Sequence, residues 1–438
     1  MNWFNFFDTK SQALRHSFGR GINAKLSKDE ELLFDQASEA FEKKDILSGY
    51  EYFLKSLKNF TDDISNENVS LSRDGDTLHF EIFQGTARIE GNVTEKSLYA
   101  ELIIAKHNSA NVGLKRYILD RNYQLTYAYY FSDSDHIKLK IYHDNTTMNP
   151  QKIFFPLREI ALNGDFDKEY IRNEFPDVAL EDLSHLQEIS TKELEIKYNF
   201  MQKTIQELHT KIETLPSNDN AGMQAFLLLK TLYMFDYLLV PKYNIYQKSS
   251  KKIQEYFAEE SESIESKNNE LYLYISQLQE MSFEEFCSNF YNAKYTFNPS
   301  DNSSKEEIDN FISESLLKVR WYKNNRYKQI IPTIYKYIVF HIFYNYGLNP
   351  VTKNLLHILI EIQNPNFFKS LEYTPLYDPE KNSFAKKSII SKIEEIIEPH
   401  QYRYKHLESF GEELNFDSLN EFSNSFYQQI QNLNFEEV

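Results

Sequence analysis

Cysteine is almost absent from this sequence, since Cys287 is the only one in 438 residues. A single cysteine excludes an intrachain disulfide and any zinc site built from several thiolates. Cys287 lies between Phe286 and Phe290, and the nearest histidines in the sequence are His209 and His341. We therefore expect a thiol that packs as a small apolar group and does not act as a nucleophile.

Glycine and proline are also scarce, with 11 and 12 copies. The sequence contains no glycine-rich phosphate loop of the P-loop or dinucleotide-binding type and no Gly-x-Ser-x-Gly motif of hydrolases. It has no His-Glu-x-x-His motif and no calcium-binding loop. These absences predict that the protein uses no cofactor and no metal ion. The shortage of turn residues favours long helices.

Long apolar runs are missing as well. The most apolar windows span residues 225–240 and 330–343, and charged residues interrupt both, Lys230 and Asp236 in the first and Lys336 in the second. A membrane-spanning helix needs about 20 largely uncharged residues, so these windows predict buried core helices. No secretory signal opens the sequence, and we expect a cytoplasmic protein.

Positive charge is in deficit, with 48 basic against 65 acidic residues and a net charge of −17. Such a surface repels phosphates, so we do not expect the protein to bind nucleic acid. One exception is the amphiphilic segment 1–26, in which aromatic residues precede several cations. Its aromatic candidates for partner binding are Trp3, Phe4, Phe6 and Phe7. We expect them to dock on the protein's own body or on a second copy; the alternatives are a frayed segment and a membrane surface.

The second exception is the segment 318–328, which holds five cations and three aromatics and no acid. Its candidate partner-binding residues are Lys318, Arg320, Trp321, Tyr322, Lys323, Arg326, Tyr327 and Lys328. Three interpretations are open. The segment is a helix end whose cationic stems pack over aromatic rings, a surface for an acidic protein partner, or a stacking platform for nucleic acid.

The hydrophobic period changes along the chain. Helical spacing holds up to about residue 60 and then gives way to an alternation of apolar and polar residues. In the segment 77–83, Leu78, Phe80 and Ile82 share one face, and His79 lies on the other. The pattern predicts strands at 69–73, 77–83, 86–93, 98–105, 125–131 and 136–144, and helices at 111–120 and 150–164. Together these elements predict an α+β domain over residues 27–175, with an antiparallel sheet and flanking helices.

Three features of this domain can be compared with a known fold: Gln84-Gly85-Thr86 before a strand, the segment 114–122 before Leu125-Thr126-Tyr127, and the helix at 150–164. In these features the chain resembles the type III secretion chaperone-like fold, and most closely its YbjN-type sensory-transduction regulators. Members of that fold are small binding modules that commonly dimerise and hold partner segments against a sheet or helix face. The resemblance therefore implies a protein partner and a homodimer, and it brings no catalytic residues.

The rest of the chain shows helical spacing and no strand pattern. We expect one long helix at 222–257, kinked at Pro241 because proline removes a backbone donor and crowds the preceding turn. The clearest loop, at 298–304, separates a helical region at 176–298 from another at 305–438. We expect these two regions to pack together as a mainly α-helical domain.

The sequence thus predicts a non-enzymatic, chaperone-like or adaptor protein that recognises a protein partner. One alternative is an enzyme, a nuclease or hydrolase, whose site is assembled from distant helices. Its candidate residues are His341, His357 and Asp236, because apolar helices displace the pKa values of titratable groups. The other alternative is a structural subunit of a larger assembly.

Overall fold

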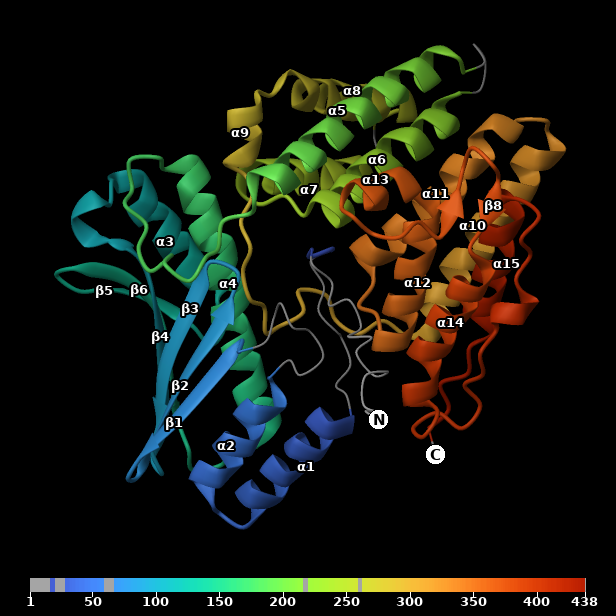
Figure 1. The fold of residues 1–438 in the computed structure, drawn as a ribbon. Helices are drawn as coiled ribbons and strands as arrows, with labels where there is room; N and C mark the ends of the chain where they lie inside the picture. The colour runs from blue at the N-terminus through green and yellow to red at the C-terminus, as the bar shows by residue number, and fades with distance from the viewer. Residues whose placement is uncertain (1–15, 20–27, 59–66, 216–219, 259–261, 438) are drawn as a thin grey trace, which may run out of the picture.

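The computed structural model describes residues 16–19, 28–58, 67–215, 220–258 and 262–437. A sheet-containing module is followed by a helical module (Figure 1). This arrangement confirms the predicted α+β fold class, a sheet with flanking helices before a mainly helical part. The aromatic candidates of the segment 1–26 lie outside the described residues, so their docking stays a prediction. They are Trp3, Phe4, Phe6 and Phe7.

The first module is built around a six-stranded antiparallel sheet with the order β1-β2-β3-β4-β6-β5. Its strands are β1 (Val69–Asp74), β2 (Thr77–Gln84), β3 (Ala87–Val93), β4 (Ser97–Lys106), β5 (Tyr129–Ser132) and β6 (His136–Asp144). As the alternation predicts, Leu78, Phe80 and Ile82 of β2 are buried and His79 is exposed. The period of two therefore identifies the face of the sheet that packs into the core.

Strand β5 is shorter than the predicted strand 125–131. The backbone N–H groups of Thr126, Tyr127 and Ala128 donate hydrogen bonds to the Glu159 carboxylate, at 2.6 to 2.9 Å. These donors are satisfied by a helix side chain and so take no part in a strand ladder.

Four helices accompany the sheet: α1 (Lys28–Glu42), α2 (Ile46–Ser56), α3 (Val112–Gln124) and α4 (Pro150–Glu174). Helix α4 lies along one face of the sheet (Figure 1), and its residues Ile153, Leu157 and Ile160 belong to the core of this module. It begins as predicted, with the Asn149 side chain accepting a hydrogen bond from the N–H of Lys152 and proline in the first turn.

Helix α4 extends well beyond its predicted end at residue 164. The extension contains Asp167, Lys168 and Glu169, which are all buried. Three consecutive charged residues usually lie in solvent, so the hydrophobic pattern did not predict that the helix continues through them. These three side chains find their partners in distant segments, and tertiary contacts therefore decide the length of α4.

The second module is helical. It comprises α5 (Thr191–Glu213), α6 (Ala221–Leu239), α7 (Tyr243–Ala258), α8 (Ile264–Glu280), α9 (Phe283–Cys287), α10 (Lys305–Asn324), α11 (Ile331–Asn345), α12 (Pro350–Gln363), α13 (Pro365–Ser370), α14 (Lys386–Ile397) and α15 (Leu419–Asn432). Helices α6 and α11 contain the two most apolar windows and pack against each other. The helices before and after the loop 298–304 share one hydrophobic core. Cys287 is partly buried against that core, and burial raises its thiol pKa.

Two details of the helical part were predicted wrongly. The predicted helix 222–257 is not kinked but interrupted, because Val240 adopts a left-handed conformation with a φ of 54° and ends α6. Pro241 follows it and cannot donate the next helical hydrogen bond. The second error is that no strand was predicted in this part of the chain. In the structure, β7 (Tyr377–Asp378) and β8 (Ser383–Phe384) form a short antiparallel hairpin.

The two modules meet along α4. The Glu169 carboxylate accepts hydrogen bonds from the Tyr291 hydroxyl at 2.6 Å and from the Tyr243 N–H at 3.2 Å. The Arg172 guanidinium lies 3.6 Å from the centre of the Tyr243 ring. Phe297, from the segment between α9 and α10, inserts into the core of the sheet module. Helix α4 is therefore shared by both modules.

Residues 16–19 pack on the helical module, although the sheet module follows them in the sequence. The Phe18 ring lies 5.2 Å from the Phe368 ring and 5.3 Å from the His357 ring, measured between centroids. The Gly19 N–H donates a hydrogen bond to the carbonyl oxygen of Tyr237 at 2.8 Å. At these residues the N-terminal segment docks on the protein's own body.

Candidate functional site

The basic–aromatic segment predicted from the sequence forms the last turns of α10 and the connection to α11. Its five cations and Trp321 are exposed, whereas Tyr322 and Tyr327 are half-buried. The Tyr322 ring makes edge contacts with Phe226 of α6 and with Trp321, at centroid distances of 6.2 and 4.9 Å. Trp321 also lies nearly parallel to Tyr327, at 6.4 Å. The two tyrosines thus hold the tryptophan in place on the surface.

An apolar pair forms the centre of this surface. Leu317 and Trp321 are four residues apart on α10, so they are neighbours on one side of the helix. Their side chains are 58% and 54% exposed. Leu317 was not among the sequence candidates, and its i,i+4 spacing to Trp321 becomes informative only once the helix is known to include both. We call the set Leu317, Lys318, Arg320, Trp321, Arg326 and Lys328 the α10 surface.

The cations of this region differ in their surroundings. Lys323 approaches Glu421 of α15 at 3.7 Å. The four cations of the α10 surface form no ion pair within the described part of the chain, and no Asp or Glu occurs in residues 315–360. Cations in the last turn of a helix stabilise its free carbonyl groups. That effect applies to Lys323, whereas Arg326 and Lys328 follow the helix and lie outside its last turn.

The face of the sheet that α4 leaves open is a second exposed surface. It carries the exposed aromatic residues Tyr129, Phe131 and Tyr142. Its charges are mutually compensated, because the Glu101 carboxylate lies 3.0 Å from the Lys138 ammonium and 3.3 Å from a second lysine, on β6. A compensated surface selects a charged partner less strongly than the α10 surface does.

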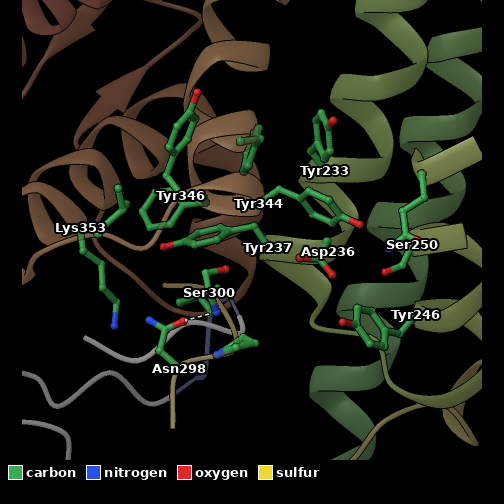
Figure 2. A pocket seen from close by; sticks show the side chains of 17 residues that line it. Tyr233, Asp236, Tyr237, Tyr246, Ser250, Asn298, Ser300, Tyr344, Tyr346 and Lys353 are labelled. Atoms are coloured by element: carbon green, nitrogen blue, oxygen red, sulfur yellow. Dashed lines mark hydrogen bonds between the residues drawn. The ribbon is translucent and has the colours of Figure 1, made fainter. Parts of the chain in front are cut away.

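A cavity of about 200 Å³ lies where residues 18–19, the helices α6, α7, α11 and α12 and the loop 298–300 meet (Figure 2). Much of its wall consists of aromatic rings, those of Phe18, Tyr233, Tyr237, Phe340, Phe343 and Tyr346. Figure 2 shows four further side chains that point toward one another on one side of it: Asp236, Tyr246, Ser250 and Tyr344. Lys353 lines the other side, with its ammonium directed away from Asp236.

The three residues considered for an enzyme are only partly brought together. Asp236 lines the cavity, whereas His341 and His357 do not. The Nδ1 atom of His357 is 2.8 Å from the Tyr237 hydroxyl, behind the wall. Burial lowers the pKa of His341 to about 4, and the positive charge of Lys318 adds to this effect. His341 is therefore neutral at pH 7, and neither imidazole reaches the cavity.

Within the described ranges, no three His, Cys, Asp or Glu side chains are grouped so that they could hold a metal ion. None of the helices described combines the length and the apolar character that crossing a membrane requires. Comparison with models of protein families and with curated proteins found no match to this chain. Arguments about function therefore rest on the surfaces and the cavity themselves.

Proposed function

We propose that this protein is a chaperone-like or adaptor protein that holds an acidic polypeptide segment of a partner protein on its α10 surface. One observation supports the proposal above all. The exposed pair Leu317 and Trp321 is accompanied by four cations without an acidic partner in the described part of the chain. Tryptophan and arginine are the residues most enriched among those that dominate binding energy at protein interfaces.

The charge of the whole molecule narrows the class of partner. With a net charge of −17, most of the surface repels an acidic segment, and the α10 surface attracts it. This contrast fixes where and in which orientation the segment binds. A segment that combines Asp or Glu with an apolar side chain satisfies both the cations and Trp321. Nucleic acid fits less well, because stacking platforms present several aromatic rings in succession. Of the three aromatic rings here only that of Trp321 is exposed, and Tyr322 and Tyr327 are half-buried.

A random-peptide display selection on the immobilised full-length protein tests the proposal. We expect the selected peptides to be enriched in Asp and Glu next to an apolar residue. Binding of the best peptide is then measured by fluorescence anisotropy with Trp321→Ala and Arg320→Glu variants. Loss of a dominant interface residue costs about 2 kcal/mol or more, so Trp321→Ala should weaken binding roughly 30-fold. Arg320→Glu should also weaken peptide binding, and the difference in affinity between this variant and the wild type should grow as the salt concentration is lowered.

Matched controls are available on other helices. Phe257 of α7 is 54% exposed, as Trp321 is, and Lys387 of α14 is an exposed cation. Phe257→Ala and Lys387→Glu should leave peptide binding unchanged. Selected peptides without acidic residues, or peptides that bind Trp321→Ala as well as the wild type, would refute the proposal. An oligonucleotide that binds more tightly than the best peptide would do the same.

A further inference from the structure

We infer that Lys230 of α6 and Lys336 of α11 form a binding site for a phosphate group, carried by inorganic phosphate or by a small phosphomonoester. These are the lysines that interrupt the two most apolar windows of the sequence. Within the described part of the chain, no carboxylate lies at ion-pair distance from either ammonium group. Neither lysine belongs to the α10 surface, so the inference is independent of the proposed function.

Helical spacing directs Lys230 toward α11. It follows Phe226 by four residues and precedes Tyr233 by three, so the three side chains share one side of α6. The rings of Phe226 and Tyr233 lie 5.0 and 6.0 Å from the ring of Tyr337 in α11, measured between centroids. The side of α6 that carries Lys230 is therefore the side that packs on α11.

Lys336 approaches the same seam from α11. It precedes Phe340 by four residues, and the Phe340 ring lies 6.0 Å from that of Tyr237 in α6. The Lys336 ammonium donates a hydrogen bond to Oδ1 of Asn364 at 3.0 Å. Lys230 makes no hydrogen bond and no ion pair with a described residue. The seam thus brings two cations together and offers them one uncharged acceptor.

This arrangement disfavours the charged form of both lysines, and an anion would reverse that effect. Both side chains are only partly exposed. Burial, followed by the charges of Lys336 and Lys211, lowers the pKa of Lys230 to about 7. Burial and the charge of Lys211 lower the pKa of Lys336 to about 8. Glu207 opposes both shifts, but it is exposed and lies 4.0 Å from Lys203. A dianion between the two ammonium groups stabilises their charged form.

The number and direction of the cations favour a phosphate over a carboxylate. Lys211 lies on α5, and α6 packs against both α5 and α11, so positive charge reaches the site from three helices. A phosphate monoester carries about two negative charges and three acceptor oxygens, whereas a carboxylate carries one charge and two oxygens in one plane. An ammonium group has three rotatable donors and binds phosphate as a compact charge.

Isothermal titration of the full-length protein at pH 7 with inorganic phosphate and with methyl phosphate tests the inference. Acetate at the same ionic strength is the comparison. We expect saturable binding of phosphate and at least about tenfold weaker affinity for acetate. Tighter binding of methyl phosphate would support a phosphomonoester as the ligand, and tighter binding of inorganic phosphate would support the free anion. Affinity for acetate equal to that for phosphate, or no saturable binding of either phosphate probe, would overturn the inference.

Two substitutions locate the site. Lys230→Met and Lys336→Met should each weaken phosphate binding at least about tenfold. Lys230→Met removes a partly buried charge without a carboxylate partner, so its Tm in phosphate-free buffer should be no lower than that of the wild type. Lys251→Met on α7, where the lysine is 75% exposed, and Arg320→Glu on the α10 surface are the controls and should bind phosphate as the wild type does. Unchanged phosphate binding in both Lys230→Met and Lys336→Met would show that the seam is not the site.

Discussion

Glu193, in the first turn of α5, connects a buried cation with the N-terminal segment. One carboxylate oxygen lies 2.8 Å from the ammonium of Lys197, whose side chain is only 2% exposed. The other lies 2.9 Å from Nδ1 of His16. Burial lowers the pKa of Lys197 although Glu193 opposes the shift. The carboxylate therefore opposes the loss of charge that burial of this ammonium favours.

Substitution of Glu193 by glutamine keeps the shape of the side chain and removes its charge. Breaking a buried ion pair by removing one partner costs about 3–5 kcal/mol, because the remaining charge is left uncompensated. Glutamine still offers Lys197 one acceptor, so we expect a loss near the lower limit, about 3 kcal/mol. Part of the loss arises from a looser attachment of residues 16–19.

The pH dependence gives an independent check. Burial alone would raise the pKa of Glu193, but the hydrogen bond from His16 and the charge of Lys197 outweigh it and lower the pKa from 4.5 to about 2. A carboxyl group with a lowered pKa in the folded state stabilises the protein fully above its unfolded value. That stabilisation, at most about 3 kcal/mol, is lost as the pH falls from 4.5 towards 2. Glu193→Gln should lack this part of the acid sensitivity.

Urea unfolding followed by circular dichroism at pH 7 and pH 3 measures both effects. The double variant Glu193→Gln/Lys197→Met removes both charges and should recover much of the lost stability. The control is Glu39→Gln, since Glu39 forms an exposed ion pair with Lys43 on α1 at 3.2 Å. It should change stability by less than about 0.5 kcal/mol. The reasoning fails if Glu193→Gln costs under 1 kcal/mol at pH 7, or if the double variant is no more stable than the single one.

Two further substitutions concern α4. Asp167→Ala should cost about 3–5 kcal/mol in chemical denaturation, because it leaves the Arg121 guanidinium, 2.9 Å away, without its buried partner; a cost below about 1 kcal/mol would contradict this. For Asp165, burial and then the charge of Glu169 raise the pKa to about 7, so the wild type loses stability as the pH rises from about 4 to 7. The Tm of Asp165→Asn minus the Tm of the wild type should therefore increase as the pH is raised from 5 to 8. A Tm difference that stays constant between these pH values would refute this.

Local sequence patterns were sufficient to predict a helix or strand where that element presents one face to the core. The alternation in β2 and the asparagine and proline at the start of α4 are signals carried by neighbouring residues, and both elements occur where they were predicted. The end of α4 carried no such signal. The buried Lys168 ammonium donates hydrogen bonds to the carbonyl oxygens of Thr86 and Glu181, at 3.1 and 2.9 Å. Those acceptors belong to other parts of the chain, so a sequence pattern shows only a charged residue.

The candidate sites follow the same rule. The α10 surface was predictable because its cations and Trp321 are close in sequence, and only Leu317 had to be added from the helix geometry. The cavity was not predictable, because its walls come from segments scattered between residues 18 and 353. Asp236 was noticed as a charge in an apolar helix, but the hydroxyl groups of Tyr246 and Tyr344 that accompany it are on other helices.

The wrong prediction at Pro241 explains why the cavity could not be foreseen. In one continuous helix the backbone rises about 1.5 Å per residue, so Asp236 and Ser250 would be about 21 Å apart along its axis. The left-handed conformation of Val240 ends α6, and α7 begins as a separate helix at Tyr243. As a result, Asp236 and Ser250 line the same cavity. The residue that ends α6 therefore also assembles the polar side of the site, and it does so through a backbone conformation that hydrophobic periodicity does not encode.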